Sequence, residues 1–160
     1  MLMADELRKA PLAIQIVGGQ DLAVAAWTWK TFQLYPLFIN RAFGIVEDGE
    51  LKGSFMFREH NGINAEFSYY ARDMMTPGMI RFAARFALQE LCVERITIRI
   101  PRNRKRLGKK LLALGGKVEG TLRKFYGRED GAKSDAIQYV FFKEQLLRFA
   151  GSAYRLRKMN

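Results

Sequence analysis

The sequence has almost none of the residues that make disulfides and zinc sites. Among 160 residues there is one cysteine, Cys92, and one histidine, His60. A lone cysteine cannot close an internal disulfide, and the two residues together cannot supply the four ligands of a structural zinc ion, so we expect no metal. Cys92 stands between Leu91 and Val93, and this apolar setting favours a buried thiol over a reactive one.

Long apolar runs are also missing. No stretch approaches the length of a membrane span, and the opening residues MLMADELRKAPL carry acidic residues and lack the apolar core of a secretory signal. Nor does any stretch rich in Pro, Ser or Gly mark a linker. We therefore expect one soluble, cytoplasmic domain over residues 1–145, followed by a basic tail over residues 146–160.

Acidic residues are few relative to basic ones. The chain has 16 Asp and Glu against 27 Lys and Arg, a net charge of +11 at pH 7. This charge attracts polyanions at long range whatever the fold. Nucleic acid, anionic membranes and phosphorylated ligands all fit it, so charge alone does not choose among these partners.

Hydrophobic periodicity predicts that strands and helices alternate. Asp48-Gly49 and Asn61-Gly62 supply the positive φ angles of two tight turns, which predicts a three-stranded meander. Thr76 and Pro77 are suited to the N-cap and first position of a helix. The strand after that helix should pair locally in parallel with the strand before it. The predicted strands are 13–17, 43–47, 51–58, 63–71, 95–100, 117–125 and 136–143, and the predicted helical segments are 22–38, 77–91 and 102–114.

This order of elements is similar to the GNAT fold. Segments 65–70 (AEFSYY) and 85–91 (RFALQEL) resemble parts of the ribosomal-protein N-terminal acetyltransferase branch of that superfamily. The resemblance covers residues 43–145 and implies an α/β (α+β) fold, with a mixed, mostly antiparallel sheet of six to seven strands and helices on both faces. The motifs that carry it, with D-x-x-x-Y among them, are Leu114-Gly115, Glu119-Gly120-Thr121-Leu122-Arg123, Gly131, Asp135, Tyr139 and Glu144.

The resemblance implies a site for acetyl-CoA where the fourth and fifth strands splay apart. The pyrophosphate would lie at the turn before helix 77–91, which is usually Arg/Gln-x-x-Gly-x-Gly/Ala in the family. Here the turn reads RDMMTPG, which keeps the Arg and one Gly, changes the spacing and adds a proline that has no N–H. The cofactor-binding residues carried over from the family are Arg72, Met74, Met75, Thr76, Gly78, Asn103 and Arg104.

Acetyl transfer needs a group that keeps the acceptor amine neutral and a proton donor for the departing thiolate. Glu66, on the fourth strand, is the candidate base, and a solvated strand carboxylate is the alternative. Tyr69 and Tyr139 are the candidate acids. Tyr70 and Tyr126 are alternatives, since Tyr69 and Tyr70 occupy opposite faces of their strand. Four aromatic residues either pack or line the cleft: Trp27, Trp29, Phe32 and Tyr35.

Basic residues crowd segment 102–110. They fit the phosphates of CoA, the phosphates of a nucleic acid, or a solvated face. No aromatic residues are interleaved with them, so we expect no base-specific recognition, and we expect no membrane partner. The candidate polyanion contacts are Arg102, Lys105, Arg106, Lys109 and Lys110, with Arg104 shared with the cofactor.

Two functions remain open at this point. The first is an acetyl-CoA-dependent N-acetyltransferase that acts on a protein or small-molecule amine. The second is a non-catalytic GNAT-like binding or structural module. Short divergent chains of this kind resemble ones encoded by bacteriophages, and such a module in a virion could contact nucleic acid or other subunits, with Arg155, Arg157 and Lys158 of the tail contributing.

Overall fold

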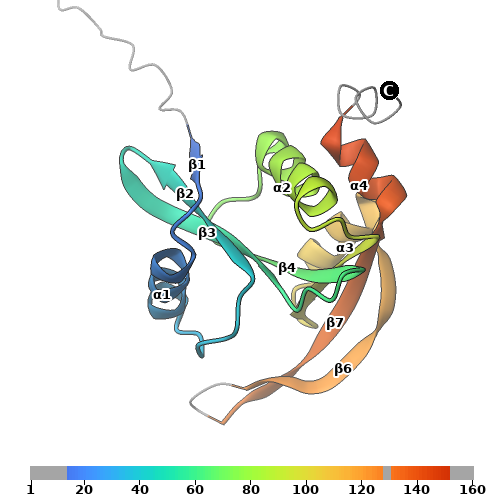
Figure 1. Ribbon diagram of the computed structural model, residues 1–160. Coiled ribbons are helices and arrows are strands. Elements are labelled where there is room, and N and C mark those ends of the chain that lie inside the picture. Colours follow the sequence, from blue (N-terminus) through green and yellow to red (C-terminus); the bar gives the residue numbers. More distant parts are fainter. Residues whose placement is uncertain (1–13, 128–130, 152–160) are drawn as a thin grey trace, which may run out of the picture.

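The computed structural model describes residues 14–127 and 131–151 (Figure 1). Its seven strands form one sheet in the order β1-β2-β3-β4-β5-β7-β6. Adjacent strands are antiparallel except β4 and β5, so the expected mixed, mostly antiparallel sheet with one parallel pair is confirmed. The elements are β1 (Gln15–Val17), α1 (Asp21–Phe32), β2 (Arg41–Glu47), β3 (Glu50–Arg58), β4 (Asn64–Ala71), α2 (Pro77–Gln89), β5 (Arg95–Pro101), α3 (Lys105–Ala113), β6 (Lys117–Gly127), β7 (Lys133–Phe142) and α4 (Lys143–Ala150).

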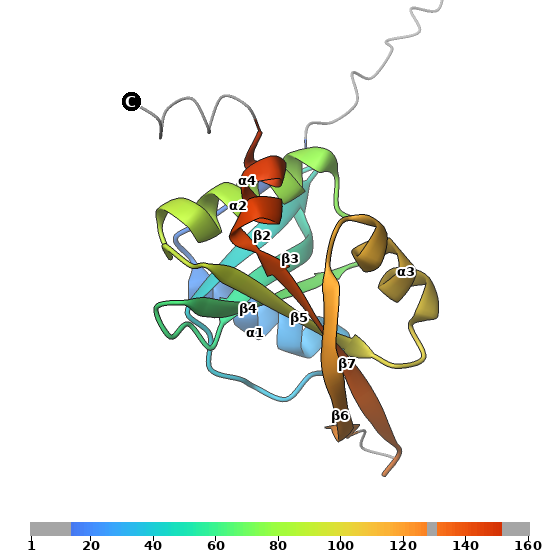
Figure 2. The same ribbon diagram turned by 90° about the vertical axis from the view of Figure 1, so that its right-hand side faces the viewer.

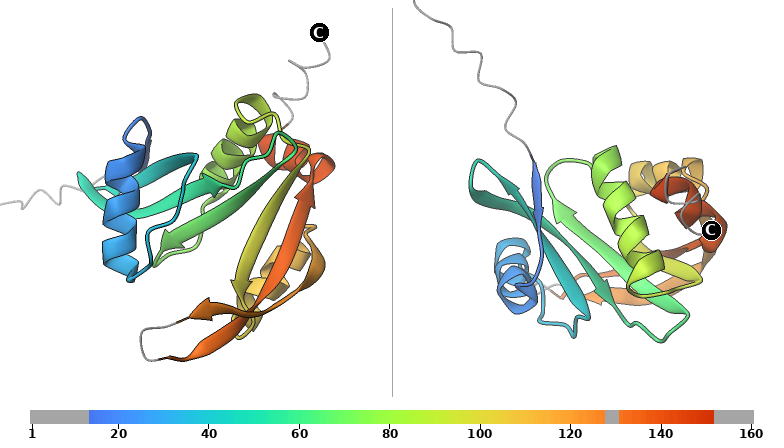
Figure 3. Two further views of the ribbon diagram at one scale, coloured as in Figure 1. Left: turned by 60° about the horizontal axis from the view of Figure 1, so that its bottom comes forward. Right: turned by 45° about the horizontal axis from the view of Figure 1, so that its top comes forward.

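Helices cover both faces of the sheet, as the resemblance implied. Helices α2, α3 and α4 pack on one face, where phenylalanine side chains dominate the main core. Helix α1 packs on the other face, against a smaller cluster on β2 and β3. The turned views in Figures 2 and 3 show α1 on the opposite side of the sheet from α2. Successive side chains of a strand point to opposite faces, so each central strand contributes to two different environments.

Helix α1 is shorter than the segment predicted from its apolar residues. It ends at Phe32, and the next residue, Gln33, adopts a left-handed conformation. Residues beyond it run irregularly to β2 and leave Tyr35 and Phe38 exposed. Thr28 holds the helix to the sheet, because its hydroxyl lies 2.6 Å from that of Ser54 in a buried pair.

The two predicted turns differ in outcome. Asp48 and Gly49 both have positive φ, as a tight hairpin requires. The second connection is longer than a two-residue turn, and its positive φ angles occur at Glu59 and Gly62. The positive φ predicted for Asn61 was therefore wrong. Asn61 shapes the connection through its side-chain oxygen, which accepts hydrogen bonds from the amides of residues 63 and 64 at 3.1 and 2.8 Å.

Helix α4 was not predicted. It follows β7 directly and buries Leu146 and Ala150 in the main core beside α2. The helix has only eight residues, which is too short for a clear helical period in the sequence. It also lies between the alternating pattern of the preceding strand and the basic tail that we expected to follow. Residues 152–160, which include the basic tail residues Arg155, Arg157 and Lys158, lie outside the described residues.

Cys92 is exposed, so the buried thiol predicted from its neighbours was wrong. The residue has a positive φ of 53°, which turns its side chain outward while Leu91 and Val93 are both buried. Among the described residues, no helix is long and apolar enough to cross a membrane.

Candidate active site

Strands β4 and β5 pair only at their beginnings. The parallel register covers three residue pairs, from Asn64 opposite Arg95 to Glu66 opposite Thr97. Beyond this point β4 stays paired with β3, and β5 stays paired with β7. The two halves of the sheet therefore diverge, as the left view of Figure 3 shows. Parallel strands that stop pairing leave backbone N–H and C=O groups of both strands available to a ligand.

Glu66 lies at the last paired position of β4, and its side chain is only 4% exposed. Its carboxylate accepts hydrogen bonds from two arginines: Arg58 binds Oε1, and Arg99 Nη1 lies 2.5 Å from Oε2. The hydroxyl of Ser68 donates a weaker bond to Oε1 at 3.4 Å. A buried charge needs such partners. Since Glu66 is buried and paired, the alternative interpretation from the sequence, a solvated carboxylate on the strand, was wrong.

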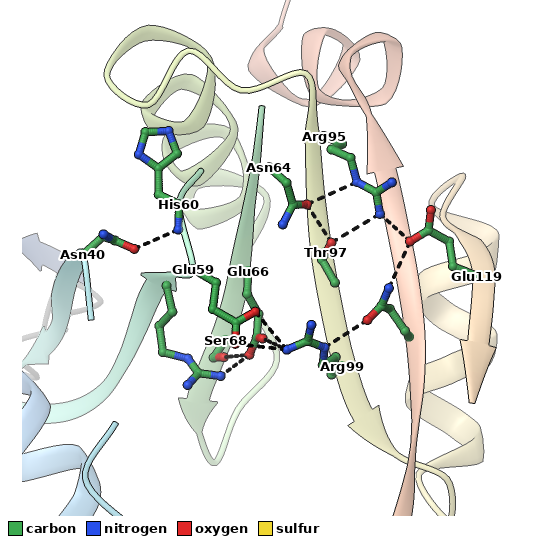
Figure 4. Close-up of polar contacts among 12 residues, drawn as sticks. Asn40, Glu59, His60, Asn64, Glu66, Ser68, Arg95, Thr97, Arg99 and Glu119 are labelled. Carbon is green, nitrogen blue, oxygen red and sulfur yellow. Dashed lines mark hydrogen bonds and ion pairs between the residues drawn. The ribbon is translucent and has the colours of Figure 1, made fainter. Parts of the chain in front are cut away.

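The Arg99 guanidinium links Glu66 to the neighbouring strands (Figure 4). Its Nη1 also donates to the exposed carboxylate of Glu59, at 3.1 Å to Oε2, and its Nε donates to Gln138 at 3.0 Å. From Gln138 the network continues to Glu119 at 3.1 Å. Polar side chains thus run unbroken across β4, β5, β7 and β6 on the face opposite α2.

A second branch of this network begins at Arg95. It pairs with Glu119, and its Nε donates to Asn64 at 3.2 Å, while Thr97 donates to the same Asn64 oxygen at 2.7 Å. The hydrogen bond from Arg95 lowers the pKa of Glu119, partial burial opposes the change, and a further bond from Gln138 supports it. One ion pair and two hydrogen bonds to Asn64 therefore link β4, β5 and β6 where β4 and β5 are still paired.

Tyr126, near the tip of β6, reaches the same face. Burial raises its pKa to about 12; the charge of Glu66 and the hydroxyl of Tyr70 add to the rise, and Arg99 and Arg58 oppose it. Burial likewise raises the pKa of Tyr70, whose ring lies 5.7 Å from that of Phe32 in α1. Both phenols therefore stay protonated at neutral pH, near the Glu66 carboxylate.

The two tyrosines predicted as acids lie on the other face. Tyr69 packs against the main core and its hydroxyl donates to the carbonyl of Asp73 at 2.8 Å. Tyr139 is buried beneath α3, with its hydroxyl against Gly108. The structure thus brings Glu66 together with Tyr70 and Tyr126, and not with Tyr69 or Tyr139.

The turn predicted to hold a pyrophosphate joins β4 to α2. Thr76 is the N-cap of α2, as predicted, and its side chain accepts a hydrogen bond from the amide of Met79 at 3.2 Å. Pro77 has no amide hydrogen, which leaves Gly78 to offer the remaining N–H of the first turn. Arg72 and Met74 are exposed in the turn, and Met75 packs partly against the core.

Asn103 and Arg104 lie at the opposite side of the divergence, between β5 and α3, and both are exposed. Arg104 is the N-cap of α3, where its side chain makes no capping hydrogen bond. The predicted polyanion contacts are also exposed: Arg102, Lys105, Arg106, Lys109 and Lys110.

No protein-family model matches this chain, and no curated protein matches its sequence. Solved structures do match. A candidate acetyltransferase from T. thermophilus is 23% identical, with a TM-score of 0.59 over 74% of this chain and 65% of its own. Another candidate acetyltransferase is 22% identical, with a TM-score of 0.60 over 69% of this chain and 60% of its own. A chimera of the spermidine N-acetyltransferase SpeG from Vibrio cholerae and hSSAT is 13% identical, with a TM-score of 0.67 over 84% of this chain and 98% of its own.

These neighbours share their GNAT-like fold with this chain. The chain spans 65% of the length of the T. thermophilus neighbour and 60% of the length of the other candidate acetyltransferase. The GNAT-like fold that the sequence resemblance implied is thus confirmed by three-dimensional structure, at identities that establish the fold alone.

Sequence reasoning missed the arginines that bind Glu66. The alternation of segment 95–100 did place Arg95 and Arg99 on the face opposite the buried isoleucines. It could not indicate that Arg58, from another strand, would meet Arg99 at one carboxylate. That contact depends on the register of β3 against β4 and of β4 against β5, which no local pattern specifies.

Proposed function

We propose that this chain is an acetyl-CoA-dependent N-acetyltransferase that acts on an amine of a protein or a small molecule. The observation that carries the proposal is the divergence of β4 and β5 after three paired positions, next to a turn that leads into a helix N-terminus. This is the arrangement in which the fold accommodates the thioester between the two strands. The acetyltransferase neighbours support the same chemistry.

The turn between β4 and α2 fits a pyrophosphate, although it offers fewer amides than the family pattern. Gly78 is exposed, and a Cβ added there would meet nothing closer than Thr76 Oγ1 at 3.8 Å, so a ligand can approach the backbone at this position. Arg72 is exposed beside it and has no ion-pair partner within the described residues. Arg72, Gly78 and the flanking Met74, Met75 and Thr76 would hold the phosphates, with Asn103 and Arg104 facing them across the divergence. Acetyl-CoA, when bound, supplies the activated acetyl group.

Proton transfer falls to the residues on the α1 face. Glu66 can accept a proton from the acceptor amine at Oε2, which is bound by Arg99 alone and keeps a second lone pair. Release of Arg99 would make that oxygen more basic. Arg99 already touches Glu59 and can retain that partner while it leaves Glu66. Tyr126 stays protonated and is the donor we assign to the departing thiolate. Tyr69 and Tyr139 remain candidates whose place on the other face favours a role in packing.

A polyamine acceptor, as in the spermidine enzyme among the neighbours, fits this face poorly. Glu66, Glu59 and Glu119 all bind arginines, so their charges are neutralised before an acceptor arrives. A primary amine carried by a neutral or anionic molecule suits the site better than a polycation.

Titration calorimetry with CoA tests the cofactor half of this proposal. We expect one site per chain, weakened at least about tenfold by Arg72→Ala, because one hydrogen bond to a charged group is worth about 1.5–3 kcal/mol. Arg81→Ala, which removes an exposed arginine of α2, is the matched control and should bind normally. No heat at millimolar CoA would overturn the proposal.

Acetyl transfer to a panel of amines is then followed by release of free thiol. Cys92 is exposed and would react with the thiol reagent, so the assay uses the Cys92→Ser variant. Thiol release that requires an amine acceptor supports the transferase. Release at the same rate without any amine would indicate thioester hydrolysis instead.

A further inference from the structure

Basic side chains cover the outer surface of α3. We define the α3 basic patch as Lys105, Arg106, Lys109 and Lys110, all of them exposed. Exposed Arg102 and Arg104 precede the helix and extend the patch toward β5. No other helix of the described chain carries so dense a group of one charge.

The patch lacks the acidic partners that surface cations usually have. Within residues 14–127 and 131–151, none of its four side chains forms an ion pair, and neither does Arg104. Only Arg102 has a carboxylate nearby, Asp135 at 3.5 Å, and Arg102 is 67% exposed. By contrast, the arginines around Glu66 and Glu119 are all paired with carboxylates.

These cations lie where helix stability alone would disfavour them. Lys105 and Arg106 occupy the first turn of α3, at the positive end of the helix dipole, and that turn contains no acid. Lys105 faces Lys109, and Arg106 faces Lys110, at the i, i+4 spacing where like charges repel. The N-cap side chain gives no compensating hydrogen bond. A local arrangement that disfavours folding, without a structural gain, is typical of a binding surface.

The patch points away from the candidate active site. At about 100° per residue, its four side chains span an arc of about 140° on the helix, opposite Leu107 and Leu111, which face the core. Gly108, also on the inner side, lets the helix approach the sheet so closely that an added Cβ would lie 2.4 Å from Tyr139 Oη. Figure 2 shows α3 at the periphery of the ribbon. The cations are therefore held outward, and a cofactor between β4 and β5 would not neutralise the whole patch.

We propose that the α3 basic patch binds the phosphate backbone of double-stranded nucleic acid without regard to base sequence. Lys and Arg side chains on a rigid helix suit a regular array of phosphates. No aromatic side chain lies among the four cations, so the patch lacks the stacking platform of single-strand binders. Leu107 and Leu111 of α3 pack on the sheet, and Leu112, which is 48% exposed, is the one large apolar side chain that the helix presents to a bilayer. This function is independent of acetyl transfer.

The test measures binding of the full chain to a fluorescent 30-base-pair duplex of mixed sequence at several salt concentrations. Four neutralised phosphates predict a slope of about −3.6 for the logarithm of affinity against the logarithm of salt concentration. A duplex of unrelated sequence should bind equally. No binding to either duplex at low salt, or a strong preference for one sequence, would overturn the proposal.

Charge reversal separates this patch from the net charge of the protein. Lys105→Glu with Lys109→Glu should weaken duplex binding at least tenfold and flatten the salt slope by about 2. Lys30→Glu with Lys52→Glu changes the net charge equally, at exposed positions on α1 and β3, and should leave the slope unchanged. Equal losses in both variants would show a net-charge effect and contradict the assignment to α3.

Two further measurements complete the test. Calorimetry with CoA should give the same affinity for the Lys105→Glu, Lys109→Glu variant as for the unaltered chain. If the variant loses both CoA binding and duplex binding, the patch is part of the cofactor site and the proposal is overturned. Vesicles containing phosphatidylserine should not compete with the duplex at 150 mM salt. Tighter binding to the vesicles than to the duplex would assign the patch to a membrane surface instead.

Discussion

Arg99 bridges two carboxylates of different exposure: its Nη1 lies 2.5 Å from Oε2 of Glu66 and 3.1 Å from Oε2 of Glu59. The side chain of Glu66 is 4% exposed, whereas that of Glu59 is 53% exposed. The Arg99 guanidinium therefore connects the buried Glu66 carboxylate, where β4 and β5 diverge, to the exposed Glu59 carboxylate. The two carboxylates should differ sharply in their effect on stability, although they share this partner.

Glu66→Gln should lower the free energy of unfolding by about 2–4 kcal/mol, because it leaves the largely buried Arg58 without a counter-charge and leaves Arg99 with only the exposed Glu59. Glu59→Gln is the matched control and should lower it by no more than about 1 kcal/mol, as is usual for an exposed ion pair. Urea unfolding monitored by tryptophan fluorescence measures both. Equal effects would contradict the assignment of Glu66 as the buried centre of the network.

Glu66→Gln should also slow acetyl transfer at least about tenfold, since a positioned base contributes about 10²–10⁴ to the rate. The rate is measured well below the unfolding temperature of the variant, so that the loss of stability does not enter. Ser68→Ala removes the 3.4 Å hydrogen bond to Glu66 and a hydrogen bond with Tyr70, but no charge, and should change the rate by less than about threefold. An unchanged rate in Glu66→Gln would remove Glu66 from the reaction.

Tyr126→Phe should make the stability of the protein less sensitive to alkaline pH. The folded-state pKa of Tyr126 is about 12, above the ordinary value of 10. Between these values the unfolded chain has lost a proton that the folded chain keeps, so stability that is present below pH 10 is lost as the pH rises toward 12. Urea unfolding between pH 9 and about pH 11.5 should show a steeper fall for the unaltered chain than for Tyr126→Phe. Tyr35→Phe, at an exposed tyrosine, should follow the unaltered chain.

Gly108→Ala should destabilise the protein by about 1–3 kcal/mol, because the new methyl group would lie 2.4 Å from Tyr139 Oη. Removal of that hydroxyl in Tyr139→Phe leaves the nearest ring atom at 3.4 Å, an ordinary contact. The double variant should therefore recover most of the loss, and a double-mutant cycle should give a coupling of about 1 kcal/mol or more. Gly120→Ala, where an added Cβ meets nothing within 4 Å, is the control for a glycine substitution without a clash.

Lys105→Glu should stabilise the protein by about 0.5–1 kcal/mol. A carboxylate in the first turn of α3 interacts favourably with the helix dipole, and it replaces a repulsive pair with Lys109 by an attractive one. Lys110→Glu, in the last turn, should give a smaller gain, because the attractive pair that it forms with Arg106 is offset by an unfavourable interaction with the helix dipole. A larger rise in unfolding temperature for Lys105→Glu than for Lys110→Glu would establish that the cations in the first turn of α3 reduce stability.

Several elements were predictable because their signals are local. Helix α2 begins at Pro77 after the Thr76 cap, as predicted from those two residues and the spacing of the apolar ones. The alternation of segment 95–100 predicted both the strand β5 and its polar face. Segment 22–38 was predicted too long, since apolar residues on all sides give no period that marks where α1 ends.

The sequence alone determined the order of the elements from β1 to β7 and the concentration of cations at residues 102–110, because periodicity, caps, turns and charge are properties of neighbouring residues. The GNAT-like fold class followed from the resemblance of its motifs to that superfamily. Only the tertiary structure decided which side chains share a site. Glu66 meets Arg58 and Arg99 because β3, β4 and β5 align in one register, and Tyr126 joins them because the β6–β7 hairpin extends beside the strands. Such contacts depend on strand pairing between distant segments, where a shift of one residue would send every side chain to the other face.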